Sequence, residues 1–138
     1  SAGIVLHNEE KIIVPCLNNP PADPIITIPD KVKINTEIVI KVVSTDPEED
    51  KIQYRFKLGK YGKPSNWVGP YDSGIEQVWQ LKVFHIGDLR IGAQAMDVNG
   101  AESDWSYNTV TYSIEHIRYI YYNFFLSIFN RLFQQIVL

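Results

Sequence analysis

The sequence has little cysteine and little methionine. Cys16 is the single cysteine among 138 residues, so the chain can form neither an internal disulfide nor a cluster of thiolate metal ligands. An unpaired cysteine in a secreted chain indicates an intermolecular bridge or a free thiol, and we expect the free thiol. Because Met96 is the only methionine, we expect that the start of the chain is processed. Removal of a secretory signal peptide would do this, and a cloning remnant is the alternative.

The sequence also lacks an excess of positive charge and any known catalytic motif. It carries 13 basic and 16 acidic residues, a net charge of −3, whereas nucleic-acid binding needs a clustered basic surplus. The histidines, His7, His85 and His116, have no metal-ligand spacing and no accompanying nucleophile. No G-x-S-x-G, H-E-x-x-H or phosphate-binding glycine loop is present. These absences predict a protein that is not an enzyme and does not bind nucleic acid.

What is present divides the chain into three regions: an arm (residues 1–24), a body (25–114) and a tail (115–138). The arm contains two short apolar segments, residues 4–6 (IVL) and 12–14 (IIV), before a proline-rich linker. Prolines favour extended backbone, so we expect an N-terminal arm on a stiff tether. Its apolar segments can pair with the chain's own sheet or add to the sheet of a neighbour.

The body alternates apolar and polar residues with the period of half-buried strands. Segments separated by Gly, Pro, Asn and Asp turns contain strand candidates. We expect strands within residues 25–28, 37–43, 52–58, 66–71, 79–83, 89–96 and 110–114. About seven short strands in a chain of this size are typical of an immunoglobulin-like β-sandwich, so the fold class is mostly β. Trp79 alternates in phase with Leu81 and Val83, which predicts a place in the core.

The tail changes to a helical period. Its polar residues fall on one narrow stripe, and apolar residues cover the rest of the circumference, which predicts a C-terminal amphipathic α-helix. A transmembrane span is disfavoured, because a lone spanning helix would expose Arg131 and the amides of the stripe to lipid. The apolar surface exceeds what soluble monomers expose, so we expect another copy of the chain, or a membrane or envelope surface, to cover it.

We therefore expect the chain to associate with itself. The predicted assembly interface combines alternating apolar residues of the arm with the apolar side of the tail: Ile4, Leu6, Ile12, Val14, Ile117, Ile120, Tyr121, Phe124, Phe125, Ile128, Phe129, Leu132, Phe133 and Ile136.

Two ligand sites are also conceivable from the residue types. Ca²⁺ takes six to eight oxygen ligands, and Asp46, Glu48, Asp50 and Asp97 could supply some of them; the alternative is that these carboxylates stabilise turns. No EF-hand spacing is present, and no other cofactor is expected. The aromatic residues Trp67, Tyr71, Trp79 and Trp105 could form a platform for sugar rings, and the alternative is that they pack within and across the sandwich.

Three segments of the body resemble a known group of proteins. Residues 45–56 (TDPEEDKIQYRF) resemble a T-D-P-(D/E)-x-D-x-(V/I)-x-Y-x-F motif. Residues 66–74 (NWVGPYDSG) and 95–106 (AMDVNGAESDWS) are similar to W-x-G-P-Y-x-S-G and A-x-D-x-x-G-x-E-S-x-W-S motifs. These belong to archaeal and bacterial surface modules of the polycystic-kidney-disease-like (PKD-like) and fibronectin-type-III-like groups. The usual D-G-D turn of that pattern has become residues 48–50 (EED).

The resemblance implies an extracellular immunoglobulin-like module of a surface or secreted protein, and some relatives end in a similar hydrophobic tail. Together with the predicted interface, it favours a non-enzymatic structural subunit that self-assembles into an extracellular filament or surface layer. The alternative is a C-terminal accessory or anchoring module that docks on a membrane or envelope and binds glycan.

Overall fold

A computed structural model describes residue 15, residues 17–113 and residues 115–136, and of residues 115–120 and 136 it describes the backbone alone. In this part of the chain, eight strands precede one helix. The strands are β1 (Ile25–Thr27), β2 (Lys31–Lys33), β3 (Glu37–Val43), β4 (Ile52–Leu58), β5 (Val68–Tyr71), β6 (Gln77–Lys82), β7 (Gly87–Asp97) and β8 (Ser106–Ser113), and the helix is α1 (Glu115–Ile136).

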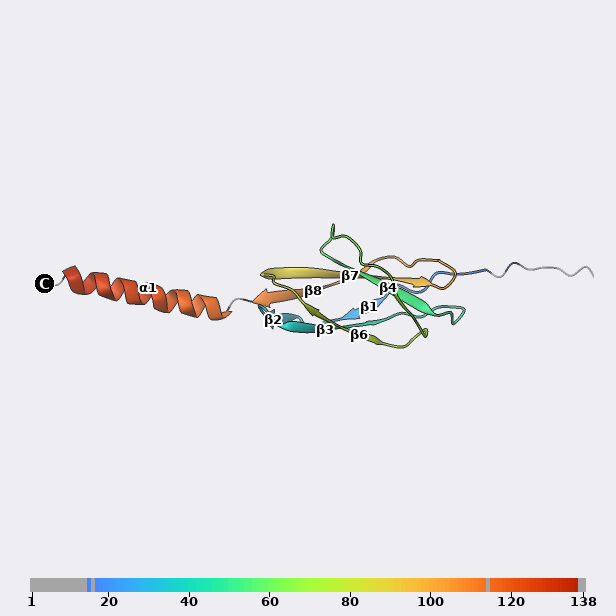
Figure 1. The fold of residues 1–138 in the computed structure, drawn as a ribbon, viewed down its shortest axis with the longest axis horizontal. Helices are drawn as coiled ribbons and strands as arrows, with labels where there is room; N and C mark the ends of the chain where they lie inside the picture. Colours follow the sequence, from blue (N-terminus) through green and yellow to red (C-terminus); the bar gives the residue numbers. More distant parts are fainter. Residues whose placement is uncertain (1–14, 16, 114, 137–138) are drawn as a thin grey trace, which may run out of the picture.

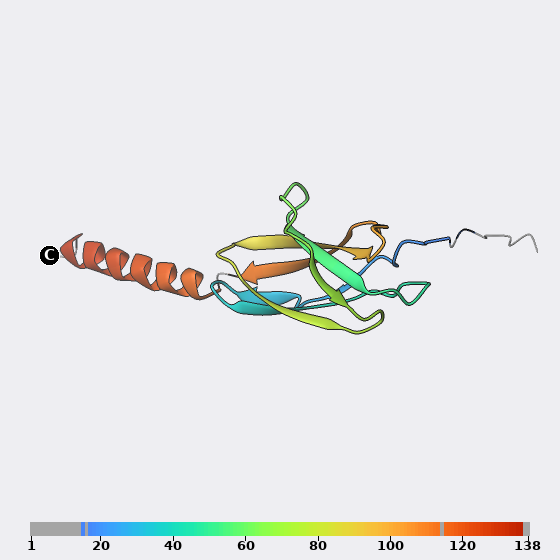
Figure 2. The same ribbon diagram turned by 45° about the vertical axis from the view of Figure 1, so that its right-hand side comes forward.

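The strands form two facing sheets, which confirms the predicted sandwich. One sheet has the order β1-β3-β6 and the other the order β2-β8-β7-β4-β5. All pairs are antiparallel except β2 with β8. Figures 1 and 2 show the two layers packed together, with α1 projecting beyond one end and residues 17–24, which lead into β1, lying at the other. The chain thus carries its two extensions at opposite ends of the sandwich.

The core lies between the sheets and is built by alternation. In β3, for example, Ile38 and Val42 are buried whereas Val39 is exposed, because successive side chains of a strand point to opposite faces. Trp79 packs edge-on against Phe56, with ring centroids 4.6 Å apart, and belongs to the partly buried rim of the core, as predicted. The buried apolar residues are Ile26, Ile38, Ile40, Val42, Ile52, Tyr54, Leu89, Ile91, Ala93, Ala95, Val110 and Tyr112.

The sandwich differs from the sequence prediction at its β2–β8 edge. Strand β2 was not predicted, because its sequence KVK offers a single apolar residue; it is held by parallel pairing with β8, from Lys31 opposite Thr111 to Lys33 opposite Ser113. Strand β8 was predicted only from Val110 onward, but it begins at Ser106. Its polar first half forms a strand because it pairs with β7, down to Ser106 opposite Ala93.

Strand β7 is buried on both faces, whereas its alternation of apolar and polar residues predicted that one face is exposed to solvent. Residues Ile91 to Ala95 are all buried. On the outer face, Tyr107 lies directly over Gly92, where an added Cβ would come within 2.9 Å of the Tyr107 Cε1 atom. A glycine is therefore required for the aromatic ring to approach the backbone so closely.

Glu49 occupies a strained position in the turn between β3 and β4. The Asp46 Oδ1 atom accepts hydrogen bonds from the backbone N–H groups of Glu48 (2.9 Å) and Asp50 (3.1 Å). The Glu49 N–H donates to the Asp46 carbonyl at 3.1 Å, and Glu49 has φ of 61°. This left-handed conformation favours glycine, which explains why the resembling motif has a glycine at this place.

Two buried tyrosines form a matched pair for testing the core. The Tyr54 hydroxyl accepts a hydrogen bond from the backbone N–H of Ser44 at 2.9 Å, whereas the Tyr112 hydroxyl has no hydrogen-bond partner among the described residues. Burial raises the pKa of both phenols. We predict that Tyr54→Phe lowers the free energy of unfolding by about 1–3 kcal/mol, because it leaves the buried Ser44 N–H without an acceptor. Tyr112→Phe should lower it by less than about 0.5 kcal/mol or raise it. Urea unfolding measures both, and equal losses would contradict the assignment.

Relief of strain at Glu49 gives a second prediction. Glu49→Gly should raise the free energy of unfolding by about 0.5–1 kcal/mol, because a left-handed residue with a Cβ costs about 1–2 kcal/mol and glycine returns part of this as chain entropy. The control is Glu48→Gly, one position earlier, which should lower stability because it removes the carboxylate that binds Asn19. Stabilisation by Glu48→Gly and not by Glu49→Gly in thermal unfolding would overturn the prediction.

Candidate functional site

The predicted assembly surface on α1 is exposed. Every described side chain from Tyr121 to Gln135 is exposed, and Phe125 reaches 73% and Phe129 58% exposure. Phe129 and Phe133 stack on each other with ring centroids 6.3 Å apart, so the helix partly covers its apolar groups with one another. The described members of the predicted interface here are Tyr121, Phe124, Phe125, Ile128, Phe129, Leu132 and Phe133.

Other members of that interface lie outside what the structure describes. The arm residues Ile4, Leu6, Ile12 and Val14 fall among residues 1–14, so the predicted pairing of the arm with its own sheet or a neighbour's also lies outside the described residues, as does Cys16. For Ile117, Ile120 and Ile136 only the backbone, in α1, is described. Within the described residues, no helix combines the length and the hydropathy needed to cross a membrane.

The candidate calcium residues belong to a cluster of hydrogen-bonded loops at the end of the sandwich away from α1. The Asp97 Oδ1 atom accepts from the backbone N–H groups of Asn99 (2.8 Å) and Ala101 (2.9 Å). Its Oδ2 atom accepts from the Asn18 side-chain amide at 2.7 Å. The Asn99 amide in turn donates to Asp50 Oδ2 at 2.8 Å. The loops that carry Asp50 and Asp97 therefore do converge, joined by asparagine amides.

This convergence uses the carboxylates as hydrogen-bond acceptors. Asp46 holds the β3–β4 turn, Glu48 binds the Asn19 amide at 2.6 Å, and Asp97 holds the turn after β7. No three His, Cys, Asp or Glu side chains gather closely enough to hold a metal ion in the described part of the chain. The geometry matches the alternative in which these residues stabilise turns. Sequence reasoning missed Asn18 and Asn19, which bind the linker to both loops. Their partners, Asp97 and Glu48, lie 79 and 29 positions away in the sequence.

The aromatic residues do not form one platform. Tyr71 and Trp79 pack inward around Tyr54, at centroid distances of 6.3 and 5.9 Å. Trp67 and Trp105 lie instead on the outer face of the five-stranded sheet, where cations cover them. Cationic and aromatic side chains alternate here in a ladder. In it, Arg55 lies 4.4 Å from the Trp67 ring, Lys57 4.1 Å from the Trp105 ring and Arg90 3.9 Å from the Tyr107 ring. Packing across the outer face explains how β7 becomes buried on both sides.

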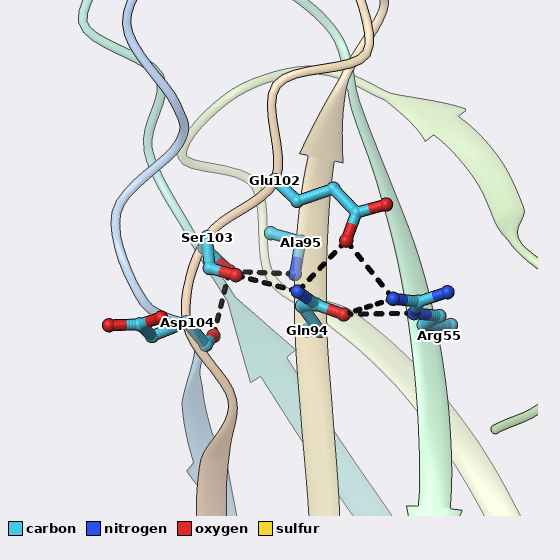
Figure 3. A network of polar contacts seen from close by, with 6 residues as sticks. All are labelled: Arg55, Gln94, Ala95, Glu102, Ser103 and Asp104. Atoms are coloured by element: carbon cyan, nitrogen blue, oxygen red, sulfur yellow. Dashed lines mark hydrogen bonds and ion pairs between the residues drawn. The ribbon is translucent and has the colours of Figure 1, made fainter. Parts of the chain in front are cut away.

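A polar network fixes the base of this ladder (Figure 3). Arg55 donates from Nη2 to Gln94 Oε1 (2.6 Å) and to Glu102 Oε2 (3.0 Å). Gln94, although polar, is only 6% exposed, and its Nε2 atom donates to the Ser103 carbonyl at 2.7 Å. The Ser103 hydroxyl accepts from the Ala95 N–H at 3.0 Å. Each buried polar group drawn here has a partner, so the network stabilises the fold and leaves no group aimed at a ligand.

His85 is the one histidine that the structure describes, and its Nε2 atom lies 3.0 Å from the Asp88 carbonyl oxygen. His7 and His116 are outside the described side chains. The ring of His85 also packs edge-on against Tyr112, with ring centroids 5.9 Å apart. The described contacts of His85 are thus a main-chain carbonyl and an aromatic ring.

Asp97 yields a pH-dependent prediction. Burial raises the pKa of its carboxyl, but the hydrogen bonds from Asn18 and the Ala101 backbone outweigh burial and hold the pKa below its ordinary value of 3.8. A carboxyl with a depressed pKa stabilises the fold above pH 4, and this contribution is lost as the pH falls through the folded-state pKa. Asp97→Asn should therefore cost about 1–3 kcal/mol at pH 7, with a smaller difference from the wild type near pH 2.

Urea unfolding at several pH values measures this difference, and Asp72→Asn is the control. Asp72 makes an exposed ion pair with Lys51 at 3.4 Å, so its replacement should change stability by less than about 1 kcal/mol. A loss at Asp97→Asn that is the same at pH 7 and pH 2 would contradict the depressed pKa.

Comparisons with known proteins bear on the sandwich. No protein-family profile matches the chain, and no curated protein matches it. Among solved structures, the chain is similar to the PKD domain of an M14-like peptidase from Thermoplasmatales archaeon SCGC AB-540-F20, with 34% sequence identity and a TM-score of 0.65. The similarity covers 70% of this chain and 98% of that domain. It confirms the resemblance to PKD-like modules on which the sequence analysis relied. The chain belongs to the PKD-domain family.

Proposed function

We propose that this PKD domain is a non-enzymatic, extracellular structural subunit that self-assembles into a filament or surface layer through α1. The observation that carries the proposal is the uncovered apolar surface of the helix. From Tyr121 to Phe133, nine large apolar side chains are at least 40% exposed. Soluble monomers rarely leave an apolar surface of this extent in contact with water. A second copy of the chain offers an identical surface that could cover it.

The energetics favour such an association. Complete burial of one large apolar side chain contributes about 1.5–3 kcal/mol, so even half of the exposed set represents a gross driving force near 10 kcal/mol. Most of the stability of a helix in a protein comes from packing of its apolar face, whereas the described apolar side chains of α1 are exposed. Association would therefore stabilise the helix as well as bury its surface.

The placement of the extensions favours open assembly. The N-terminal segment and α1 leave the sandwich at opposite ends (Figure 1). If each extension binds a different neighbour, the contacts are heterologous and propagate into rings or filaments. The extracellular part of the proposal is supported by the similarity to a PKD domain.

A second candidate is an accessory or anchoring module that docks on a membrane or envelope, with glycan binding by the sandwich. Tyr121 and Tyr122 near the sandwich and Arg131 farther along α1 favour it, because aromatic and basic residues suit a helix lying in a membrane interface. The cation-covered faces of Trp67 and Trp105 do not favour glycan stacking on those rings.

A pair of charge substitutions on α1 tests the assembly proposal. Phe125→Asp with Phe129→Asp, one turn apart on the apolar side, should abolish regular particles, since burying two unpaired carboxylates is prohibitive. The matched control is Asn130→Asp with Gln134→Asp, which adds the same charges at the same spacing on the polar stripe. Negative-stain electron microscopy and sedimentation velocity measure assembly, and thermal unfolding of the sandwich should be unchanged in both variants.

Wild-type-like particles from the phenylalanine variant would overturn helix-driven assembly. A wild-type chain that stays monomeric without lipid and floats with anionic liposomes, in a manner lost in the same variant, would instead assign α1 to membrane docking.

A further inference from the structure

The β6 edge of the three-stranded sheet is more open than the other three sheet edges of the sandwich, which are β1, β2 and β5. Strands β1 and β2 have three residues each, and β5 has four and includes Pro70, which has no N–H to donate. The Ile26 carbonyl of β1 also accepts a hydrogen bond from the Asn108 amide at 2.9 Å. Strand β6 has six residues without proline, pairs with β3 along its whole length, and no described strand pairs with its other side.

An apolar groove adjoins this edge. It has a volume of about 430 Å³ and opens between the sheets, between β6 and the end of β4. Its walls include the apolar residues Ile40, Phe56, Leu58, Trp79 and Leu81, with Lys63 at the loop beyond β4. Proteins usually protect a long edge strand with proline, a bulge or a covering element. Here an open edge and an apolar groove lie together, which is the arrangement that accepts an added strand.

The N-terminal segment of the chain has the chemistry to fill this place. Residues 4–6 (IVL) alternate in a strand so that Ile4 and Leu6 share one face. Asn18, anchored to the loop cluster, follows Ile4 by fourteen positions, and fourteen extended residues reach about 45 Å. Residues 12–14 are too near that anchor to reach along a neighbour. Glu9 and Glu10 follow the apolar segment, and their charge complements Lys63 at the groove.

We propose that β6 and its groove receive residues 4–6 of a second copy as an added strand, with Ile4 and Leu6 entering the groove. This inference rests on the proposed self-assembly and names its second contact: main-chain hydrogen bonds to β6 give affinity, and the groove selects alternating aliphatic side chains. Combined with α1 at the opposite end, the contact joins the arm of one subunit to the body of the next.

A trans-complementation experiment tests the contact. A full chain carrying Ile4→Asp and Leu6→Asp keeps its groove free of its own arms, and a fluorescent peptide of residues 1–10 (SAGIVLHNEE) is added in trans. Fluorescence anisotropy should show saturable binding. Adding Leu58→Lys to the protein should weaken binding by at least about tenfold, because a charge then lies at the apolar mouth. The matched control is Val78→Lys on the outer face of β6, which should leave affinity within about twofold.

Both positions are partly exposed, at 39% for Leu58 and 56% for Val78, and circular dichroism checks that each variant is folded. Lys63→Glu is a second groove variant on a solvent-exposed side chain, and it should also weaken binding through repulsion of Glu9 and Glu10. Absence of peptide binding, or equal binding to the Leu58→Lys protein, would overturn the proposal. The chain carrying Ile4→Asp and Leu6→Asp could instead form a dimer that Val78→Lys dissociates. That result would show that β6 pairs with β6 of a second copy, and it would also overturn the proposal.

The two proposals fail separately. Peptide binding to the groove together with normal assembly of the Phe125→Asp, Phe129→Asp variant would contradict the role of α1 and retain the groove contact. Loss of peptide binding together with assembly that depends on Phe125 and Phe129 would contradict the groove contact and retain the role of α1.

Discussion

A two-layer sandwich of this size can enclose only the side chains that point between its sheets, and every other apolar group in the chain has to find cover elsewhere. Inside, Ile38, Ile52, Tyr54 and Val110 are fully buried between the sheets. On the outer face of the five-stranded sheet, apolar groups are covered by a second, thinner layer, in which arginine and lysine side chains lie over Trp67, Trp105 and Tyr107. No such layer covers the described side chains of α1 or the groove beside β6. The same limit that makes the body stable therefore makes its extensions available to a partner.

The strands could be predicted from sequence to the extent that their burial is local and one-sided. Alternation gave β3 with its observed bounds and placed Trp79 at the core, because each pattern lies within one strand. It failed for Gln94 and Gly92, whose burial depends on side chains from β4, β8 and the β7–β8 loop, namely Arg55, Tyr107 and Glu102. It failed for β2 because parallel pairing with β8 supplies what its own residues lack. The alternation of apolar and polar residues shows which face of a strand is turned to the core. Burial of the outer face by residues distant in the sequence produces no such alternation.

The acidic loops show a different limit. The residue types around Asp46, Asp50 and Asp97 suit calcium and turn formation equally, and the structure brings Asp50 and Asp97 together through the Asn99 amide. What distinguishes the two uses is the source of the donors: backbone N–H groups and the amides of Asn18, Asn19 and Asn99 bind the carboxylates of this cluster, and Asp46 Oδ2 is the one buried carboxylate oxygen without a partner among the described residues. A carboxylate that already accepts several hydrogen bonds has fewer lone pairs for a cation. The linker asparagines also secure the N-terminal segment to the body, which determines where the arm begins its path.

That anchoring gives the two extensions different mechanical roles. Asn18 is bound to the loop cluster, so in the proposed assembly the residues before it set how far the arm can reach from that end of the sandwich. Helix α1 continues directly from the region after β8, at the other end. An interface formed by α1 alone could close into a symmetric bundle, in which like surfaces meet and growth stops. An arm that binds β6 of a different subunit is heterologous by construction, because the donor and acceptor surfaces differ. In the proposed assembly, the arm contact would allow open-ended growth, and the helix contact would supply the burial that makes growth favourable.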